Sequence, residues 1–178
     1  MELIENTNYL FALGTLFLQI ITVALITVFV LQKRVPVFRD VARQVSAWGL
    51  WAAFAVSLSA TVMAIFYSDV IGFDACPLCW WQRVFLVPQI LLLGLAAWKR
   101  DGYMAEYSII LSFFGAGIAL YQHILQMVPG SGLPCPATGT SCALRIVFEF
   151  GYITLPLMAF TVFLFLIVAM LFVRARRD

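Results

Sequence analysis

Long stretches without a charged residue constrain this chain more than any other feature of its sequence. In a helix, about 20 apolar residues span the hydrocarbon core of a bilayer. Four uncharged stretches reach that length: residues 9–31, 47–67, 107–128 and 152–173. A fifth, residues 80–98, is interrupted only by Arg83 near one end, where a long side chain can reach the polar interface.

Each of these stretches is predicted to be a helix, because an irregular segment or an open sheet would leave backbone groups unpaired in lipid. The composition agrees: 63% of the 178 residues are hydrophobic and 11% are charged, whereas about 25% are charged in a typical soluble domain. The sequence therefore predicts an all-α integral membrane protein with five transmembrane helices.

The first stretch is expected to be a retained membrane anchor. The leading residues MELIENTN contain two glutamates and no lysine or arginine. A removable signal peptide, in contrast, begins with a basic segment.

The basic residues predict how the five helices are oriented. Nine of the eleven lysines and arginines fall on one side when the helices are threaded in turn; they lie in residues 32–46, 99–106 and 174–177. The other side has only Arg83 and Arg145. Basic loops face the cytoplasm in membrane proteins, so the N-terminus and residues 68–79 and 129–151 are expected outside. The small net charge of +2 gives no reason to expect nucleic-acid binding.

Four cysteines form two pairs, and both pairs lie in the segments expected outside. Cys76 and Cys79 belong to FDACPLCWWQR (73–83), and Cys135 and Cys142 lie in a segment rich in Pro, Gly, Ser and Thr. Thiols outside the cytoplasm can be oxidised to disulfides. A Cys-x-x-Cys disulfide closes so short a loop that it adds little stability, and such pairs more often cycle between dithiol and disulfide. Redox-active pairs are therefore favoured over purely structural disulfides, which remain the alternative.

A zinc site is a further alternative for four cysteines. All-cysteine zinc sites usually have two short-spaced pairs. Here six residues separate Cys135 from Cys142, and Pro136 follows the first of them. No metal is expected.

The residues after the first cysteine pair suit an apolar electron acceptor. Thiol–disulfide exchange moves two electrons at a time, so two redox pairs can connect a soluble dithiol protein to a lipid-soluble acceptor. Trp80, Trp81 and Arg83 provide aromatic surface and a cation, which fits a mostly apolar ligand with a few polar anchors. Arg83 lies four residues after Cys79, on the same helical face, where its charge would favour the thiolate. By its position alone, Arg83 is also expected simply to reach the interface.

Taken together, these features resemble the DsbB family, also called BdbC in Gram-positive bacteria, which consists of quinone-reducing membrane oxidases. YQHILQM (121–127), Arg145 shortly after Cys142 and Pro156 in ITLP also resemble family features. The resemblance covers about residues 48–175. In vitamin K epoxide reductase-like proteins the loop pair precedes the Cys-x-x-Cys, whereas here it follows.

The resemblance implies a four-helix transmembrane bundle of the DsbB type with one extra N-terminal helix. It divides the chain into residues 1–46, which hold the extra helix and a basic linker, and residues 47–178, which form the redox domain. The extra helix with its basic linker is one departure from the family pattern, and two others follow. The loop between the second pair of cysteines is short, and Gln122 precedes His123 where an acidic residue is frequent.

The resemblance also implies roles for single residues. Cys76 and Cys79 would be the pair coupled to quinone, with Cys79 facing the ring. Cys135 would be attacked by the soluble partner, and Cys142 would link back to Cys76. Arg83, Trp80 and His123 are the residues expected to bind the quinone.

The implied function is that of a membrane thiol–quinone oxidoreductase in the bacterial inner membrane. It would reoxidise a DsbA-like thiol oxidase, soluble or tethered to the membrane, and pass the electrons to ubiquinone or menaquinone. The alternatives are a structural membrane protein with two outward-facing disulfides and a vitamin K epoxide reductase-like quinone reductase.

Overall fold

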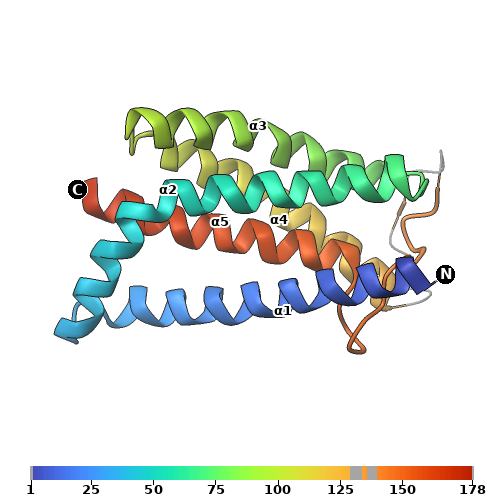
Figure 1. Ribbon diagram of the computed structural model, residues 1–178, viewed down its shortest axis with the longest axis horizontal. Coiled ribbons are helices and arrows are strands. Elements are labelled where there is room, and N and C mark those ends of the chain that lie inside the picture. The colour runs from blue at the N-terminus through green and yellow to red at the C-terminus, as the bar shows by residue number, and fades with distance from the viewer. Residues whose placement is uncertain (1, 129–133, 136–139, 178) are drawn as a thin grey trace.

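The computed structural model describes residues 2–128, 134–135 and 140–177, and it consists almost entirely of long helices (Figure 1). In chain order these are α1 (Glu2–Leu31), α2 (Pro36–Ile65) with the π-helical turn η1 (Phe66–Val70), α3 (Pro77–Lys99), α4 (Met104–Met127) and α5 (Leu155–Arg177). All five α-helices are long and apolar enough to cross a membrane. The predicted all-α architecture with five transmembrane helices is confirmed.

Helix α5 lies at the centre of the structure and packs against α1, α2 and α4, while α3 packs against α2 and α4. Phe163, Leu166 and Met170 of α5 are fully buried. Small residues let helices approach closely in a membrane, where lipid competes equally for apolar side chains. Gly115 of α4 is such a residue, because a side chain at this position would overlap the ring of Phe163.

Helix α1 lies along the outside of the bundle formed by α2 to α5 (Figure 1). Its buried face is small and polar, and consists of Asn8, Ala12, Thr15 and Thr22. The Tyr67 hydroxyl donates a hydrogen bond to Asn8. Gln19 donates to the Thr161 hydroxyl over 3.2 Å and accepts from the Tyr152 hydroxyl over 3.0 Å. The extra helix is therefore fixed to the bundle by side-chain hydrogen bonds as well as by packing.

Several helix boundaries differ from the sequence prediction; α1, for example, begins at Glu2 and not at residue 9. Residues 36–46, predicted as part of a basic loop, form the first turns of α2, with Pro36 at the helix start, where proline is favoured. Figure 1 shows these turns crossing the end of the bundle before α2 runs along it. Helix α3 begins at Pro77, so Cys79 lies in its first turn and not before the helix.

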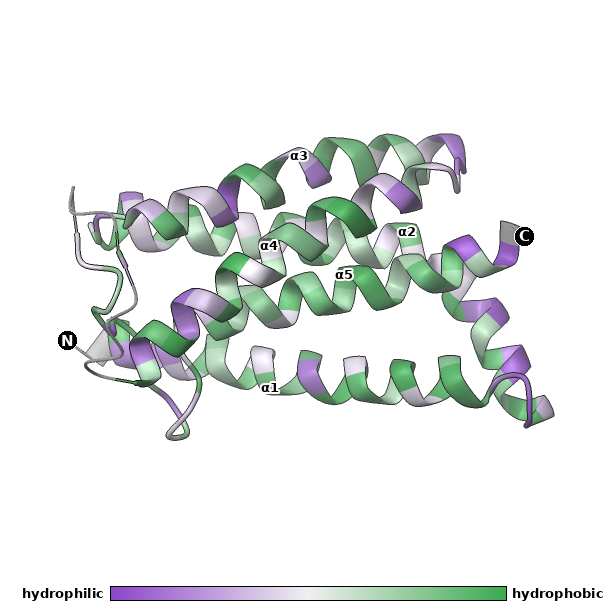
Figure 2. Ribbon diagram, turned by 180° about the vertical axis from the view of Figure 1, so that it is seen from behind, coloured by the Kyte–Doolittle hydropathy of each residue, from purple (hydrophilic) through white to green (hydrophobic). Residues whose placement is uncertain are grey.

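The two ends of the molecule differ in chemistry, as the sequence predicted. The α1–α2 turn with the first turns of α2, the α3–α4 turn and the C-terminal end of α5 lie together at one end (Figure 2). These segments carry nine of the eleven lysines and arginines, whereas other hydrophilic residues occur at both ends. The N-terminus and the segments with the cysteines lie at the opposite end (Figure 1).

Candidate functional site

The first cysteine pair is shaped by the start of α3. Cys76 has an extended backbone and is the N-cap of the helix, and Pro77 occupies the first turn. The Cys76 sulfur accepts a hydrogen bond from the backbone N–H of Cys79 over 3.4 Å. This places the two thiol sulfurs 3.0 Å apart. The N-terminal end of a helix favours negative charge, so the geometry suits a thiolate.

Gln122 of α4 connects the two sulfurs. Its amide nitrogen donates to the sulfur of Cys76 over 3.1 Å and to that of Cys79 over 3.4 Å. Gln82 donates to the Gln122 oxygen over 2.7 Å, which fixes the orientation of this amide. The amide is a neutral donor, so it stabilises a thiolate where a carboxylate would repel one.

The pKa of Cys76 is held below the usual value of a thiol. The main cause is the hydrogen bond from the Cys79 thiol; burial opposes it, and the backbone N–H groups of Leu78 and Cys79 and the amide of Gln122 add to it. A thiolate is the nucleophile in disulfide exchange. The contacts therefore favour the thiolate form of Cys76.

The second cysteine pair is a disulfide between Cys135 and Cys142, and it is held by the last turns of α4. The Tyr121 hydroxyl donates to the carbonyl of Pro134 over 2.7 Å. Gln126 donates to the carbonyls of Cys142 and Leu144 over 3.3 and 2.9 Å. Pro136, which follows Cys135, lies outside the described residues.

All four cysteines pack into one cluster with Leu78, Tyr121 and Leu125. Cys76 and Cys142 are buried, with 4% and 0% of their surfaces exposed, whereas Cys79 and Cys135 are partly exposed. Each pair thus has one buried and one partly exposed cysteine. The sequence placed both pairs on one side, and the structure brings them into one cluster.

Arg83 lies beside the first pair but is held by other groups. Its guanidinium donates to the carbonyl of Ala64 in α2 over 2.8 Å and lies 5.0 Å from the centre of the Trp80 ring. Together with Cys79, Arg83 lines a cavity of about 60 Å³. That is about the volume of two water molecules, so the cavity would have to widen to accept a quinone ring.

His123 does not reach this cavity. Its Nδ1 lies 2.8 Å from the hydroxyl of Thr154, and this hydroxyl also accepts the backbone N–H of Leu157 over 3.4 Å in the first turn of α5. In this conformation His123 links α4 to the start of α5.

The sequence did not reveal the roles of Tyr121, Gln122 and Gln126. These three residues hold both cysteine pairs from a single helix. The sequence does contain a pattern that indicates such a role, because Gln122 and Gln126 are four residues apart and share one face of an otherwise apolar helix.

Comparison with known proteins finds one matching family and several relatives. The family described as "Disulfide bond formation protein DsbB" matches residues 46–173. Disulfide bond formation protein C of Bacillus subtilis is 31% identical over 130 residues, which are 72% of this chain and 94% of that protein. A probable disulfide formation protein of Chlamydia pneumoniae is 34% identical over 67% of this chain and 86% of its own length.

A third relative, the SPbeta prophage-derived disulfide bond formation protein B of Bacillus subtilis, is 41% identical over 60% of this chain and 72% of its own length. No solved structure matches the chain. The matched residues include α3, α4 and all four cysteines. The chain is a multi-pass membrane protein that belongs to the DsbB family of disulfide bond formation proteins.

Proposed function

We propose that this protein is a membrane thiol–quinone oxidoreductase. It reoxidises an extracytoplasmic DsbA-like thiol oxidase and passes the electrons to ubiquinone or menaquinone. One observation carries the proposal: the structure gathers both cysteine pairs, Cys76 with Cys79 and Cys135 with Cys142, into one cluster at one end of the membrane helices. Two such pairs side by side are suited to pass a disulfide from one to the other by thiol–disulfide exchange.

The electrons reach the Cys76–Cys79 pair by thiol–disulfide exchange. A thiolate of the partner attacks the Cys135 sulfur, and the bond to Cys142 breaks. The Cys142 thiolate then attacks Cys76 in the Cys76–Cys79 disulfide and releases the Cys79 thiolate.

Two further exchanges complete this transfer. The second thiol of the partner attacks the partner's first sulfur, which is bonded to Cys135 in the mixed disulfide. This leaves the partner oxidised and frees Cys135. The Cys135 thiolate attacks Cys142, which restores their disulfide and releases Cys76. The partner has lost two electrons and two protons, and Cys76 and Cys79 have gained them.

The side chains next to Cys79 fit a quinone by their chemistry. When bound, a quinone would accept the two electrons and two protons of the Cys76–Cys79 dithiol. One N–H group of Arg83 donates to the carbonyl of Ala64. Because the guanidinium has five N–H donors in all, others can donate to a quinone oxygen. Trp80 is 57% exposed, and its aromatic ring lies next to the guanidinium of Arg83. Arg83 and Trp80 therefore stay the proposed binding residues, whereas His123 would have to leave Thr154 to join them.

The proposed location is the bacterial inner membrane. The basic end faces the cytoplasm by the positive-inside rule, so the N-terminus and the cysteines face outward and the C-terminus faces inward. The proposed division into residues 1–46 and 47–178 is close to the start of the family match at residue 46. It falls inside α2, which runs without a break through this point.

The experiment that tests the proposal measures the direction and path of electron flow. Purified protein with a soluble ubiquinone analogue should oxidise a reduced thioredoxin-like protein catalytically, followed by the absorbance of the quinone. Cys135→Ser should block exchange with the partner, and Cys79→Ser should block quinone reduction while a mixed disulfide at Cys135 accumulates. Reduction of protein disulfides at the expense of quinol under the same conditions would contradict the proposal.

A further inference from the structure

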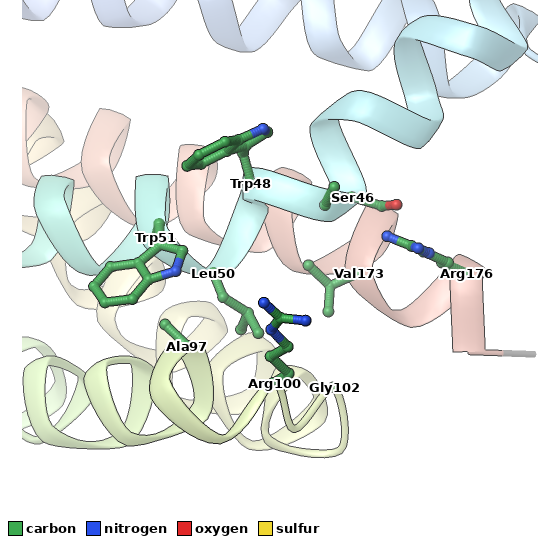
Figure 3. Close-up of a pocket in the computed structure, with 10 residues that line it drawn as sticks. Ser46, Trp48, Leu50, Trp51, Ala97, Arg100, Gly102, Val173 and Arg176 are labelled. Atoms are coloured by element: carbon green, nitrogen blue, oxygen red, sulfur yellow. The ribbon is translucent and has the colours of Figure 1, made fainter.

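A second pocket, of about 640 Å³, lies at the end of the molecule opposite the cysteines. Figure 3 shows how three elements enclose it: the bend of α2, the end of α3 with the following turn, and the last turns of α5. Residues that line it include Ser46, Trp48, Trp51, Arg100, Gly102 and Arg176. The side chains of Arg100 and Arg176 reach toward this space from two different helices (Figure 3).

The pocket lies at the level where lipid headgroups are expected. Trp48, Trp51 and Trp98 are exposed by 70, 44 and 81% at this end. Tryptophan gathers at the membrane–water interface because its ring is apolar and its N–H is polar. Leu50 and Val173 give the pocket an apolar wall as well, so its lining changes from apolar to cationic.

No ion pair neutralises the two arginines of the pocket within the part of the chain that the structure describes. Among the described residues, the guanidinium groups of Arg100 and Arg176 have neither a salt bridge nor a hydrogen-bond acceptor. Arg43 lines an adjoining pocket together with Trp48 and Arg176.

Two acidic groups at this end have other partners. Glu106 pairs with Arg174 over 3.9 Å, and Asp101 accepts the backbone N–H of Tyr103 over 2.9 Å. Two arginines thus line a space that has room for an anion, and a third, Arg43, lies beside the adjoining pocket.

The backbone at Arg100 supports a role for its side chain. Arg100 is the C-cap of α3 and has φ 55° and ψ 36°, in the left-handed region. Glycine is the usual residue at this kind of helix end because it has no Cβ. For an arginine, this backbone conformation costs free energy that glycine would not lose. Binding of a ligand by the guanidinium would offset this cost.

We propose that this pocket binds the headgroup of an anionic phospholipid. The guanidinium groups of Arg100 and Arg176 bind the phosphodiester, for which their planar N–H donors are suited, and Trp48 and Trp51 contact the start of the acyl chains. Basic pockets between transmembrane helices are suited to such headgroups. The lipid then connects the ends of α2, α3 and α5, and stabilises the bundle because it binds only the folded protein.

The test measures lipid binding by native mass spectrometry of the full chain in detergent, titrated with phosphatidylglycerol. Arg100→Gly and Arg176→Gln should each weaken binding by about fivefold, and the double variant by about 30-fold, given the usual contribution of one basic residue near anionic lipid. The matched control is Lys33→Gln/Arg34→Gln, which removes two charges at the same end but outside the pocket. It should change the affinity by less than about twofold.

Melting temperatures with and without lipid distinguish lipid binding by Arg100 from a purely structural role of this residue. Without lipid, Arg100→Gly should keep or raise the melting temperature, since glycine suits the left-handed backbone. Addition of phosphatidylglycerol should raise the melting temperature of the wild type much more than that of the variant.

Four results would overturn the proposal: wild-type affinity of the double variant, equal loss in the control, equal binding of phosphatidylcholine, or displacement of the lipid by equimolar inorganic phosphate. The last two would show a site without selectivity for anionic lipid and a site for free phosphate, respectively.

Discussion

Gln122 is the residue on which the arrangement of the two thiols depends most directly. Its single amide contacts both sulfurs, and Gln82 fixes the direction in which that amide points. Because the amide is buried, water does not replace these hydrogen bonds when they are lost. Removing the amide therefore acts on the chemistry of the pair as well as on its geometry.

We predict that Gln122→Leu raises the pKa of Cys76 toward the ordinary value of a thiol. The amide is one of the groups that lower this pKa, so its loss makes the thiolate less favourable. A lowered pKa means that the thiolate is present above that pKa and is lost as the pH falls through it. In the variant the loss should occur at higher pH. The ultraviolet absorbance of the thiolate in reduced protein, followed against pH, measures the shift.

Gln126→Leu is the matched control for this experiment. It makes the same change one helical turn further along α4, but Gln126 contacts the carbonyls of Cys142 and Leu144. The titration of Cys76 should then stay where it is in the wild type. Equal titration curves for the wild type and Gln122→Leu would show that the amide has no part in stabilising the thiolate.

Arg83 is the residue proposed to bind the oxygen on which negative charge grows as quinone is reduced. Such a contact contributes about 2–4 kcal/mol in a site partly shielded from water, or about 30- to 1000-fold in rate. Arg83→Met should slow the reduction of quinone by pre-reduced protein within this range. Arg83→Lys should be intermediate, because lysine keeps the charge but loses the planar set of donors.

Arg145→Met provides the comparison for Arg83. Arg145 is the other arginine at this end and likewise lies over an aromatic ring, 5.1 Å from the centre of Phe148. Its loss should leave single-turnover quinone reduction unchanged. Unchanged kinetics in Arg83→Met would mean that Arg83 only anchors α3 to Ala64 and to the interface.

At the residue scale, the sequence predicted what depends on local spacing. The Cys-x-x-Cys pair and Arg83 are close because they share the first turns of one helix. The contacts of Gln122 and His123 were not predictable in this way. They depend on which face of α4 is turned toward α3 and α5, and that is decided by packing between helices.

At the scale of elements, the contact between α4 and α5 determines where Tyr121, Gln122 and Gln126 of α4, which hold the two cysteine pairs, are positioned. Gly115 allows this contact, since a Cβ there would meet the ring of Phe163. Overpacking a close contact typically costs about 1–3 kcal/mol. Gly115→Leu should therefore lower the thermal stability of the protein in detergent, measured by far-ultraviolet circular dichroism.

Gly117→Leu makes the same change two residues further along α4. A Cβ at position 117 has no atom within 4 Å, so this variant should melt close to the wild type. Equal melting temperatures for the two variants would show that α4 and α5 can separate without loss of stability.

The helices themselves were predictable because hydropathy and length are properties of contiguous sequence. Their ends were less so. The first turns of α2 carry Arg39, Asp40 and Arg43 and were taken for a loop, although charged residues are equally suited to a helix that lies across the end of the bundle. The start of α3 at Pro77 depends on the Cys76 cap, which involves a contact with Cys79 that the hydropathy pattern does not contain.

At the scale of the whole molecule, the protein has a redox end and a basic end joined by apolar helices. The distribution of charge along the sequence predicted that both cysteine pairs share one end. It did not predict that the four cysteines pack into one cluster, because the two pairs are far apart in the chain and are brought together by residues of α4. Helix α1 lies on the far side of α5 from α4 (Figure 1) and leaves this contact undisturbed.

The central claim is that electrons pass between the pairs through Cys76 and Cys142, the two buried sulfurs. A Cys79→Ser/Cys135→Ser variant leaves only these two thiols. Under a mild oxidant such as diamide it should form a Cys76–Cys142 disulfide rapidly, identified by mass spectrometry of its peptides. The control Cys76→Ser/Cys135→Ser, which leaves Cys79 with Cys142, should form its disulfide much more slowly. Failure to form the Cys76–Cys142 bond, or equally fast formation of the control bond, would contradict the relay.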